Sequence, residues 1–281
     1  MAHNNAKEFD IVVHGATGFT GRLVIEYLLT RKDTGLRWAM GGRSADKLAA
    51  VRDEVGAPLD TPLVVIDSHD AASLSALMAR TRLVLTTVGP YQLYGSELVQ
   101  ACAQAGVDYV DLCGEPAWMR QMIDAHAATA SASGARIVFS CGFDSIPFDL
   151  GVFMLQQEAK ARFGAPAPRV KCRVRAMVGG FSGGTAASLM GTLAQISREP
   201  SLANTMADPF ALTPGFKGPA QPEGDSAQYD AFAKSWSGPF VMAAINTKNV
   251  HRTNALRGHP WGKEFQYDER MLTGGFYAEI E

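Results

Sequence analysis

The sequence lacks the cysteine pattern of a disulfide framework or a metal centre. Its 281 residues include four cysteines, which lie far apart and form no C-x-x-C pair. No histidines stand at zinc-finger spacing either, so we do not expect a structural metal. Unpaired thiols are typical of a reducing compartment, and the polar N-terminus (residues 1–7) has no apolar core of a signal peptide. These features favour a cytoplasmic protein.

Net charge and long apolar runs are also nearly absent. The formal net charge is -2 at pH 7, which gives no electrostatic reason to expect nucleic acid or an anionic membrane surface. No uninterrupted apolar run approaches the roughly 18–20 residues that a membrane-spanning helix needs. We expect no transmembrane segment, and peripheral membrane association is left open. A small-molecule or acyl-type substrate and a homo-oligomer are compatible with this composition.

The first half of the chain repeats a strand-like run followed by a helical stretch. Strands are expected at 9–14, 36–40, 63–66, 83–88, 107–112 and 136–140, and helices at 22–31, 45–55, 71–79, 96–104 and 117–133. Ser44 should cap the second helix and Gly106 should end the fourth. Several strands are apolar throughout, so helices should cover both faces of a parallel sheet. The pattern predicts an α/β, doubly wound Rossmann-type domain over residues 1–145.

After Gly142 the pattern changes. Helices are expected at 149–163 and 184–197, strands at 170–178, 240–246 and 264–267, and an irregular loop at 199–224, where prolines and glycines are frequent. The sequence therefore predicts a second, mixed α+β domain over residues 146–281. We expect this domain to serve in substrate binding or dimerisation.

A glycine-rich segment follows the first predicted strand and opens the first helix. A dinucleotide requires small residues at this point, because the backbone turns tightly and its N–H groups must approach the pyrophosphate. The helix N-terminus adds a partial positive charge. The residues predicted to bind the cofactor here are Gly15, Ala16, Thr17, Gly18, Phe19, Thr20 and Gly21. A glycine turn that only leads into a helix is the alternative interpretation.

The residues after the second strand indicate which dinucleotide binds. An NAD site usually has Asp or Glu there, whereas this chain has Gly41-Gly42-Arg43-Ser44. Arg43 can pair with a 2′-phosphate and stack on adenine, so Arg43 and Ser44 predict NADP, with NAD less favoured. A solvated arginine is the alternative. Asp67, which ends the third strand, could meet the adenine or cap a helix.

The nicotinamide of this fold lies at the carboxyl ends of the later strands. Val88, Gly89 and Pro90 are predicted to lie against its ribose. The candidates for catalysis are Tyr91 and Tyr94 as proton donors and Asp144 as a substrate-orienting residue. Aromatic packing or a simple turn cap explains these three residues equally well. None of the seven tyrosines has a lysine four residues later, which disfavours the Tyr-x-x-x-Lys mechanism of short-chain dehydrogenases.

Several segments together resemble the saccharopine dehydrogenase-like oxidoreductases, a group that includes the trans-acting enoyl reductases. The matching segments are Gly15–Gly21, Gly41–Ser44, Val88–Tyr91 with Gly95, Tyr109–Asp111 with Gly114-Glu115, Cys141–Pro147 with Asp149–Gly151, Ser182–Thr185 and Asn246–Asn254. The resemblance implies an NAD(P)-dependent oxidoreductase, and the enoyl reductase branch implies a lipid-linked substrate. Members generally extend further, so we expect the second domain to be shortened at its C-terminal end.

The leading hypothesis is an NADP-dependent enoyl or carbonyl reductase of lipid metabolism. One alternative is a saccharopine-type amino-acid dehydrogenase, in which Arg173, Arg175 and Arg252 would pair with substrate carboxylates. Surface arginines on a strand edge explain those residues equally well. The other alternative is a sensor or scaffold that binds NADP(H) without turnover.

Overall fold

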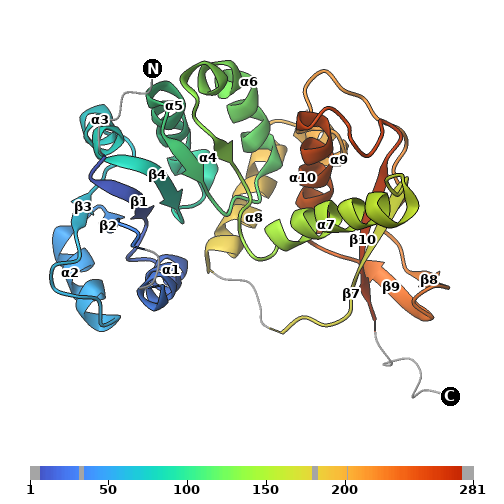
Figure 1. The fold of residues 1–281 in the computed structure, drawn as a ribbon, viewed down its shortest axis with the longest axis horizontal. Helices are drawn as coiled ribbons and strands as arrows, with labels where there is room; N and C mark the ends of the chain where they lie inside the picture. Colours follow the sequence, from blue (N-terminus) through green and yellow to red (C-terminus); the bar gives the residue numbers. More distant parts are fainter. Residues whose placement is uncertain (1–6, 32–34, 179–182, 201, 274–281) are drawn as a thin grey trace. The chain divides into compact units, whose positions relative to one another are not determined.

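The computed structural model describes residues 7–31, 35–178, 183–200 and 202–273, with only part of the side chains in the helix at 183–198. The chain divides into two compact units, Met1–Cys141 and Gly142–Glu281 (Figure 1). Each unit has its own sheet and its own hydrophobic core.

The first unit contains a six-stranded sheet in the order β3-β2-β1-β4-β5-β6, with every neighbouring pair parallel. Its strands are β1 (Phe9–His14), β2 (Trp38–Gly42), β3 (Leu63–Val65), β4 (Thr81–Thr86), β5 (Asp108–Val110) and β6 (Ile137–Val138). This order is that of the dinucleotide-binding Rossmann fold, in which the chain reverses its direction of travel between β1 and β4. The predicted doubly wound sheet is confirmed.

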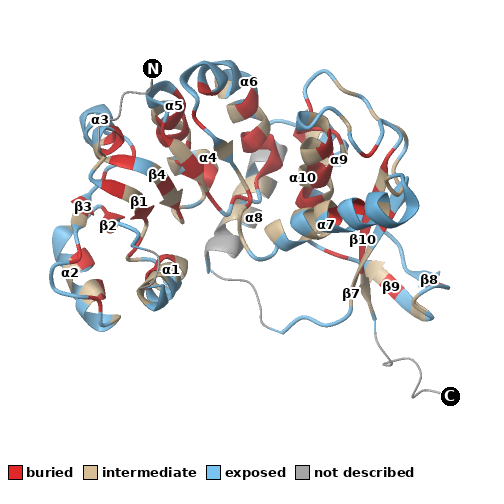
Figure 2. Ribbon diagram, in the orientation of Figure 1, coloured by how far each residue is buried: buried red, intermediate tan, exposed pale blue. Residues whose placement is uncertain are grey.

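Helices cover both faces of this sheet. They are α1 (Phe19–Thr30), α2 (Ala45–Glu54), α3 (Ala71–Arg80), α4 (Tyr91–Tyr94), α5 (Ser96–Ala105) and α6 (Pro116–Ser133). In Figure 1, α1 and α2 lie on one face, and α3, α5 and α6 lie on the other. Figure 2 shows buried residues both on the strands and on the helices. Val12 and Val13 of β1 point to opposite faces of the sheet, and both are fully buried, as expected when helices cover both faces. Val13 packs with Ile25, Met40 and Leu48 in the core under α1 and α2.

Local capping sets where these helices begin and end. The Ser44 hydroxyl accepts a hydrogen bond from the Lys47 amide at the start of α2, and Gly106 ends α5 with a left-handed φ of 67°. Both caps were expected from the sequence and are confirmed. Asp70 caps α3 by accepting hydrogen bonds from the amides of Ala72 and Ser73.

The second unit contains a four-stranded sheet in the order β7-β10-β9-β8. Its elements are α7 (Ile146–Phe163), β7 (Arg169–Val174), α8 (Gly183–Arg198), α9 (Leu202–Ala207), β8 (Gln228–Asp230), β9 (Ser235–Pro239), α10 (Ala243–Leu256) and β10 (Gln266–Leu272). β7 and β10 are parallel, whereas β9 is antiparallel to both of its neighbours. α10 packs against α7 and β10, around a core that includes Val152, Val250 and Phe265. The predicted mixed α+β architecture is confirmed.

The strand predicted at 240–246 is wrong. Strand β9 ends at Pro239, and the apolar run that begins at Phe240 leads into α10, whose Ile245 and Val250 are buried. A short apolar run is compatible with both a strand and a buried helix, so its periodicity could not decide between them. The loop expected at 199–224 contains the short helix α9.

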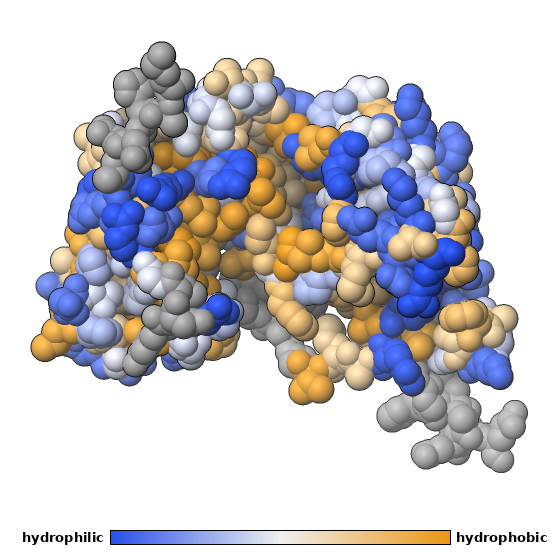
Figure 3. All heavy atoms as spheres, viewed as in Figure 1, coloured by the Kyte–Doolittle hydropathy of each residue, from blue (hydrophilic) through white to orange (hydrophobic). Residues whose placement is uncertain are grey.

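The described surface is mixed in character. Figure 3 shows that polar and apolar side chains both reach the surface of each unit, as in most folded proteins. All four cysteines are free thiols. Among the residues that the structure describes, no helix is both long enough and apolar enough to cross a membrane.

Candidate cofactor site

The residues predicted to bind the dinucleotide lie at the carboxyl edge of the first sheet. The amides of Gly15 and Ala16 donate to the Gly41 carbonyl oxygen at 2.9 and 3.1 Å, and the Thr87 amide donates to the His14 carbonyl oxygen at 2.9 Å. The loop after β1 therefore contacts the end of β2, and the loop after β4 contacts the end of β1. β1 lies between those two strands, at the point where the strand order reverses, and ligands of open α/β sheets bind there.

The glycine loop leaves no room for side chains at two positions. Gly15 has a φ of 91°, and an added Cβ would lie 2.7 Å from Thr87 Oγ1 and 2.8 Å from Val88 Cγ2. An added Cβ at Gly21, in α1, would overlap the carbonyl oxygen of Gly15. The glycines thus allow close packing of loop, helix and neighbouring strand. A turn that only leads into a helix would not require such close packing.

The start of α1 fits a phosphate group. Gly18 is the exposed N-cap residue, and within this described helix no side chain caps the first turn and no acidic residue stands in it. The first amide N–H groups and the positive end of the helix dipole are therefore available to an anion. Thr17 and Thr20 are half-buried beside Gly18, while Phe19 is exposed.

Arg43 lies at the same edge, immediately after β2. Its side chain is exposed and forms no ion pair with any residue that the structure describes. Arg43 follows Gly41 by two residues, and the Gly41 carbonyl oxygen is bonded to the glycine loop. An exposed guanidinium without a carboxylate partner is suited to pairing with a 2′-phosphate. The Ser44 hydroxyl accepts a hydrogen bond from the Lys47 amide at 3.3 Å.

A buried His14–Ser68 pair lies beneath this loop and was missed in the sequence. His14 Nε2 is 2.9 Å from Ser68 Oγ, and Nδ1 has no hydrogen-bond partner among the described residues. Burial, with the nearby charge of Arg43 as a second cause, lowers the pKa of His14 to about 4, so the ring is neutral at pH 7. In the sequence, the pair was indicated only by His14 itself, a polar residue that follows the apolar run Ile11–Val13 and directly precedes Gly15.

Asp67 is exposed after β3 and does not cap α3. Its Oδ1 accepts a hydrogen bond from the His69 amide at 3.0 Å, and its own amide donates to Ser73 Oγ at 3.0 Å. The cap of α3 is Asp70, so the helix-cap interpretation of Asp67 is wrong. Contact of Asp67 with the adenine stays a prediction.

The loop of Val88, Gly89 and Pro90 is held in place by a buried carboxylate. Glu115, which is 3% exposed, accepts hydrogen bonds from the amides of Tyr91 at 3.0 Å and Gln92 at 2.9 Å. These bonds fix the start of α4 against the loop after β5. Gly89 is exposed, so its backbone is open to a ligand.

The three catalytic candidates occupy different environments. Tyr91 is 3% exposed; its hydroxyl donates to the Thr86 carbonyl oxygen at 3.4 Å and accepts from the Leu112 amide at 3.3 Å. Burial raises its pKa well above the ordinary value, which favours packing over proton donation. Tyr94 is half-buried, with its ring centroid 5.7 Å from that of His69. Asp144 is exposed and belongs to the second unit.

A second buried carboxylate, Asp111, joins the loops after β5 and β6. It accepts hydrogen bonds from the amides of Cys113 at 2.9 Å and Ser140 at 2.8 Å, and from the Tyr109 hydroxyl at 2.8 Å. Burial raises the pKa of Asp111 to about 7, although these hydrogen bonds act in the opposite direction. Asp111 and Glu115 therefore hold the backbone of the loops at this edge of the sheet by hydrogen bonds to its amides.

The three arginines proposed for a substrate carboxylate lie in different environments. Arg173 pairs with Asp230 at 2.6 Å and Asp268 at 2.7 Å, so its expected role as an anion partner is wrong. Arg175 is exposed, and Arg252 donates to the Leu212 carbonyl oxygen at 2.7 Å. Ser182, in the Ser182–Thr185 segment, lies outside the described residues.

Comparison with known proteins identifies the first unit. Residues 11–138 match the family model of the saccharopine dehydrogenase NADP-binding domain. The cofactor that Arg43 predicts is therefore the cofactor of this domain family. Among solved structures, apo saccharopine dehydrogenase (L-Glu forming) from Saccharomyces cerevisiae aligns at 15% identity, over 59% of this chain and 34% of that chain, with a TM-score of 0.45.

Curated relatives extend the match over nearly the whole chain. The trans-acting enoyl reductase of Mycobacterium ulcerans is 40% identical over 285 residues, which cover 97% of this chain and 67% of the relative. A Mycobacterium tuberculosis protein, provisionally named as a trans-acting enoyl reductase, is 42% identical over 95% of this chain. This chain spans 66% of that relative's length. The chain belongs to the saccharopine dehydrogenase-like family that includes the trans-acting enoyl reductases.

Proposed function

We propose that this chain is an NADPH-dependent reductase that acts on an enoyl or carbonyl group of a lipid-linked substrate. The observation that carries the proposal is the exposed Arg43 beside the glycine loop at the switch point of the sheet. The names of the relatives, which are 38% to 42% identical, support the enoyl substrate.

The proposed roles of the residues follow from their positions. The first-turn amides of α1 bind the pyrophosphate, Arg43 binds the 2′-phosphate, and the backbone at Gly89 lies against the ribose. Bound NADPH supplies the hydride that reduces the double bond. Tyr94 is the proposed proton donor, because the Tyr91 hydroxyl is already bonded to Thr86 and Leu112.

We assign substrate binding to the second unit, with Asp144 as an orienting residue. Helix α7 of the second unit carries three large apolar side chains that are mostly exposed to solvent: Leu150 is 56% exposed, Met154 66% and Leu155 51%. Such a surface suits an acyl chain or a second copy of this protein. The free thiols favour a cytoplasmic location.

A titration of intrinsic fluorescence with NADPH and NADH tests the cofactor assignment. Arg43→Ala should weaken NADPH binding by about 10- to 100-fold, since it removes a charge-assisted contact, and should leave NADH binding nearly unchanged. Arg82→Ala is the matched control, because Arg82 is also exposed in the first unit but lies at the far end of β4. Equal NADPH affinity in Arg43→Ala and the parent would contradict the assignment.

NADPH oxidation tests turnover. Enoyl thioesters of increasing acyl length should be reduced, whereas pairs of amino and keto acids should not support turnover. The opposite preference would favour the saccharopine-type dehydrogenase. Tight NADPH binding with no oxidation in either series would favour the sensor or scaffold.

A further inference from the structure

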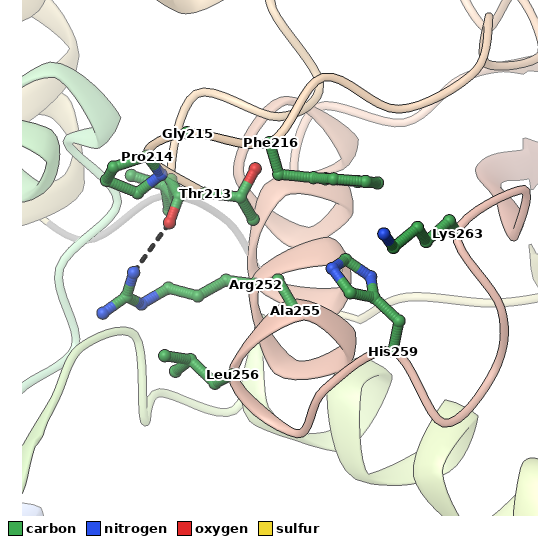
Figure 4. Close-up of a pocket in the computed structure, with 10 residues that line it drawn as sticks. Thr213, Pro214, Gly215, Phe216, Arg252, Ala255, Leu256, His259 and Lys263 are labelled. Atoms are coloured by element: carbon green, nitrogen blue, oxygen red, sulfur yellow. Dashed lines mark hydrogen bonds between the residues drawn. The ribbon is translucent and has the colours of Figure 1, made fainter.

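The second unit contains a pocket of about 390 Å³ (Figure 4). One wall is the loop Leu212–Phe216, which follows α9, and the other is the C-terminal half of α10 with the turn that ends at Lys263. This volume falls in the range of small-molecule sites in proteins. The cofactor site of the first unit contributes no residue to this pocket.

The charged groups of the pocket are both basic. Arg252 and Lys263 line it beside the His259 ring, no carboxylate does, and neither cation forms an ion pair with a residue in the described part of the chain. Figure 4 shows Arg252 and Lys263 on opposite sides, with the rings of Phe216 and His259 between them. Such a set of groups repels a metal cation and attracts an anion.

Arg252 is the most constrained of these groups. Its Nη1 donates to the Leu212 carbonyl oxygen at 2.7 Å, which holds the guanidinium beside the loop. Burial lowers the pKa of Arg252, yet a guanidinium stays charged in proteins. A partly buried charge is costly unless an opposite charge accompanies it, and the described chain supplies none. A bound anion would supply that charge.

The turn that carries His259 is held in place by hydrogen bonds within the protein. His259 has a left-handed φ of 59°, and its amide donates to the Asn254 carbonyl oxygen at 2.8 Å. The Asn254 side chain donates to the Gly262 carbonyl oxygen at 2.9 Å and accepts from the Trp261 amide at 3.1 Å. The His259 ring lies 4.3 Å from that of Phe216, and its Nδ1 is buried without a hydrogen-bond partner among the described residues. Left-handed non-glycine residues cost free energy and cluster at functional sites.

We propose that this pocket binds a small organic anion, namely a phosphate or carboxylate attached to an apolar body. Arg252 binds the anionic group, and Lys263, on the opposite side of the pocket, adds to the positive potential that attracts it. Phe216, Pro214 and Leu256 contact the apolar body. This binding is independent of the dinucleotide in the first unit.

Calorimetry on the whole chain, with and without saturating NADPH, tests the proposal. The probes are phenyl phosphate, 3-phenylpropanoate and the neutral 3-phenylpropan-1-ol, which differ in their head group. At least one anion should bind saturably at one site per chain, with the same affinity when NADPH is present. The alcohol should bind at least about tenfold more weakly. The two anions distinguish a phosphate from a carboxylate ligand. Absence of saturable anion binding, or displacement of the anion by NADPH, overturns the proposal.

Variants locate the site. Lys263→Gln and Arg252→Gln should each weaken anion binding about tenfold, and Lys217→Gln, an exposed lysine just outside the lining loop, should change it less than twofold. His259→Asn removes the ring and keeps a residue that tolerates a left-handed backbone. All four variants should keep the parent's NADPH affinity. Because Lys263 is exposed, Lys263→Gln keeps the test decisive if Arg252→Gln fails to fold. An equal loss in Lys217→Gln and Lys263→Gln means general surface charge and overturns the proposal.

Discussion

At the scale of single residues, Gly15 and Gly21 are glycines for different reasons. Gly15 has a left-handed φ of 91°, which side chains disfavour. Gly21 has an ordinary helical backbone in α1, but the space for its Cβ is taken by the carbonyl oxygen of Gly15. Alanine would therefore push the loop away from the helix.

Gly21→Ala should lower the free energy of unfolding by about 2–3 kcal/mol, since overpacking against backbone cannot relax by a side-chain rotation. It should also weaken NADPH binding. Gly151→Ala is the control, because a Cβ at Gly151 in α7 would meet nothing within 4 Å. That substitution should stabilise the protein by about 0.5–1 kcal/mol. Urea unfolding measures the free energy of unfolding of both variants. Similar effects of the two substitutions would argue against the packing explanation.

Asp111 predicts a specific dependence of stability on pH. Burial raises its pKa in the folded protein to about 7, above the ordinary value of 3.8, so the folded state binds the proton more tightly than the unfolded state. Its contribution to stability is therefore largest below about pH 4 and is lost as the pH rises to about 7. The difference in unfolding free energy between the parent and Asp111→Asn should fall over that interval.

Asp108→Asn provides the control of opposite sign. Burial acts to raise the pKa of Asp108, but the side-chain and backbone hydrogen bonds from Arg136, together with its charge, lower the pKa overall. The contribution of Asp108 to stability is therefore lost as the pH falls through the acidic range. Between about pH 5 and 8 the difference between the parent and Asp108→Asn should be flat. Urea unfolding across this pH range measures both variants. A flat difference for Asp111→Asn as well would show that Asp111 titrates normally.

At the scale of elements, one side chain joins three strands of the second sheet. Arg173 of β7 pairs with Asp268 of β10, its neighbouring strand, and with Asp230 of β8 at the opposite end of the strand order. All three side chains are largely buried. A group of this kind specifies which strands come together, although its net contribution to stability is modest.

Removal of the arginine should be costly, because it leaves buried Asp230 without an ion-pair partner and leaves buried Asp268 with Arg169 alone. We expect Arg173→Met to lower the free energy of unfolding by about 3–5 kcal/mol. Lys171→Met, on the same strand but exposed, should change it by less than about 0.5 kcal/mol. Urea unfolding followed by circular dichroism compares them. Equal effects would mean that the ion pairs contribute nothing beyond a general loss of charge.

The elements that the sequence predicted well are those with a clear period. The expected strand 9–14 coincides with β1, and the expected helix 45–55 is within one residue of α2. The second half was harder, since the buried polar residues of α10, such as Asn246 and Lys248, interrupt its apolar face. β8, a three-residue strand, offers too few positions for any period to be read.

At the scale of the whole molecule, the chain consists of two units that each bury their own core. The division between Cys141 and Gly142 falls four residues before the boundary expected from the sequence. A ligand that binds one unit stabilises that unit first, by RT ln(1 + [L]/Kd), or about 2.7 kcal/mol at 100 times the Kd.

Hydrogen exchange should therefore separate the two units. NADPH at about 100 times its Kd should slow amide exchange in β1, in the glycine loop and at 41–44, with a much smaller effect on β7 to β10. Mass spectrometry of peptides measures this. Equal protection of both units would instead indicate that they unfold as one cooperative body.

The sequence by itself determined the order of strands and helices in the first unit and the position of the glycine loop, and Arg43 predicted NADP, which is the cofactor of the matching domain family. These features depend on local periodicity and on residue types within a few positions of each other. Only the tertiary structure decided that Tyr91 is buried, that His14 pairs with Ser68, that Arg173 is bound to Asp230 and Asp268, and that Arg252 shares a pocket with Lys263. Partners far apart in the sequence, such as Arg173 and Asp268 at 95 residues, meet only when the chain packs, and no local pattern encodes which distant groups will then be adjacent.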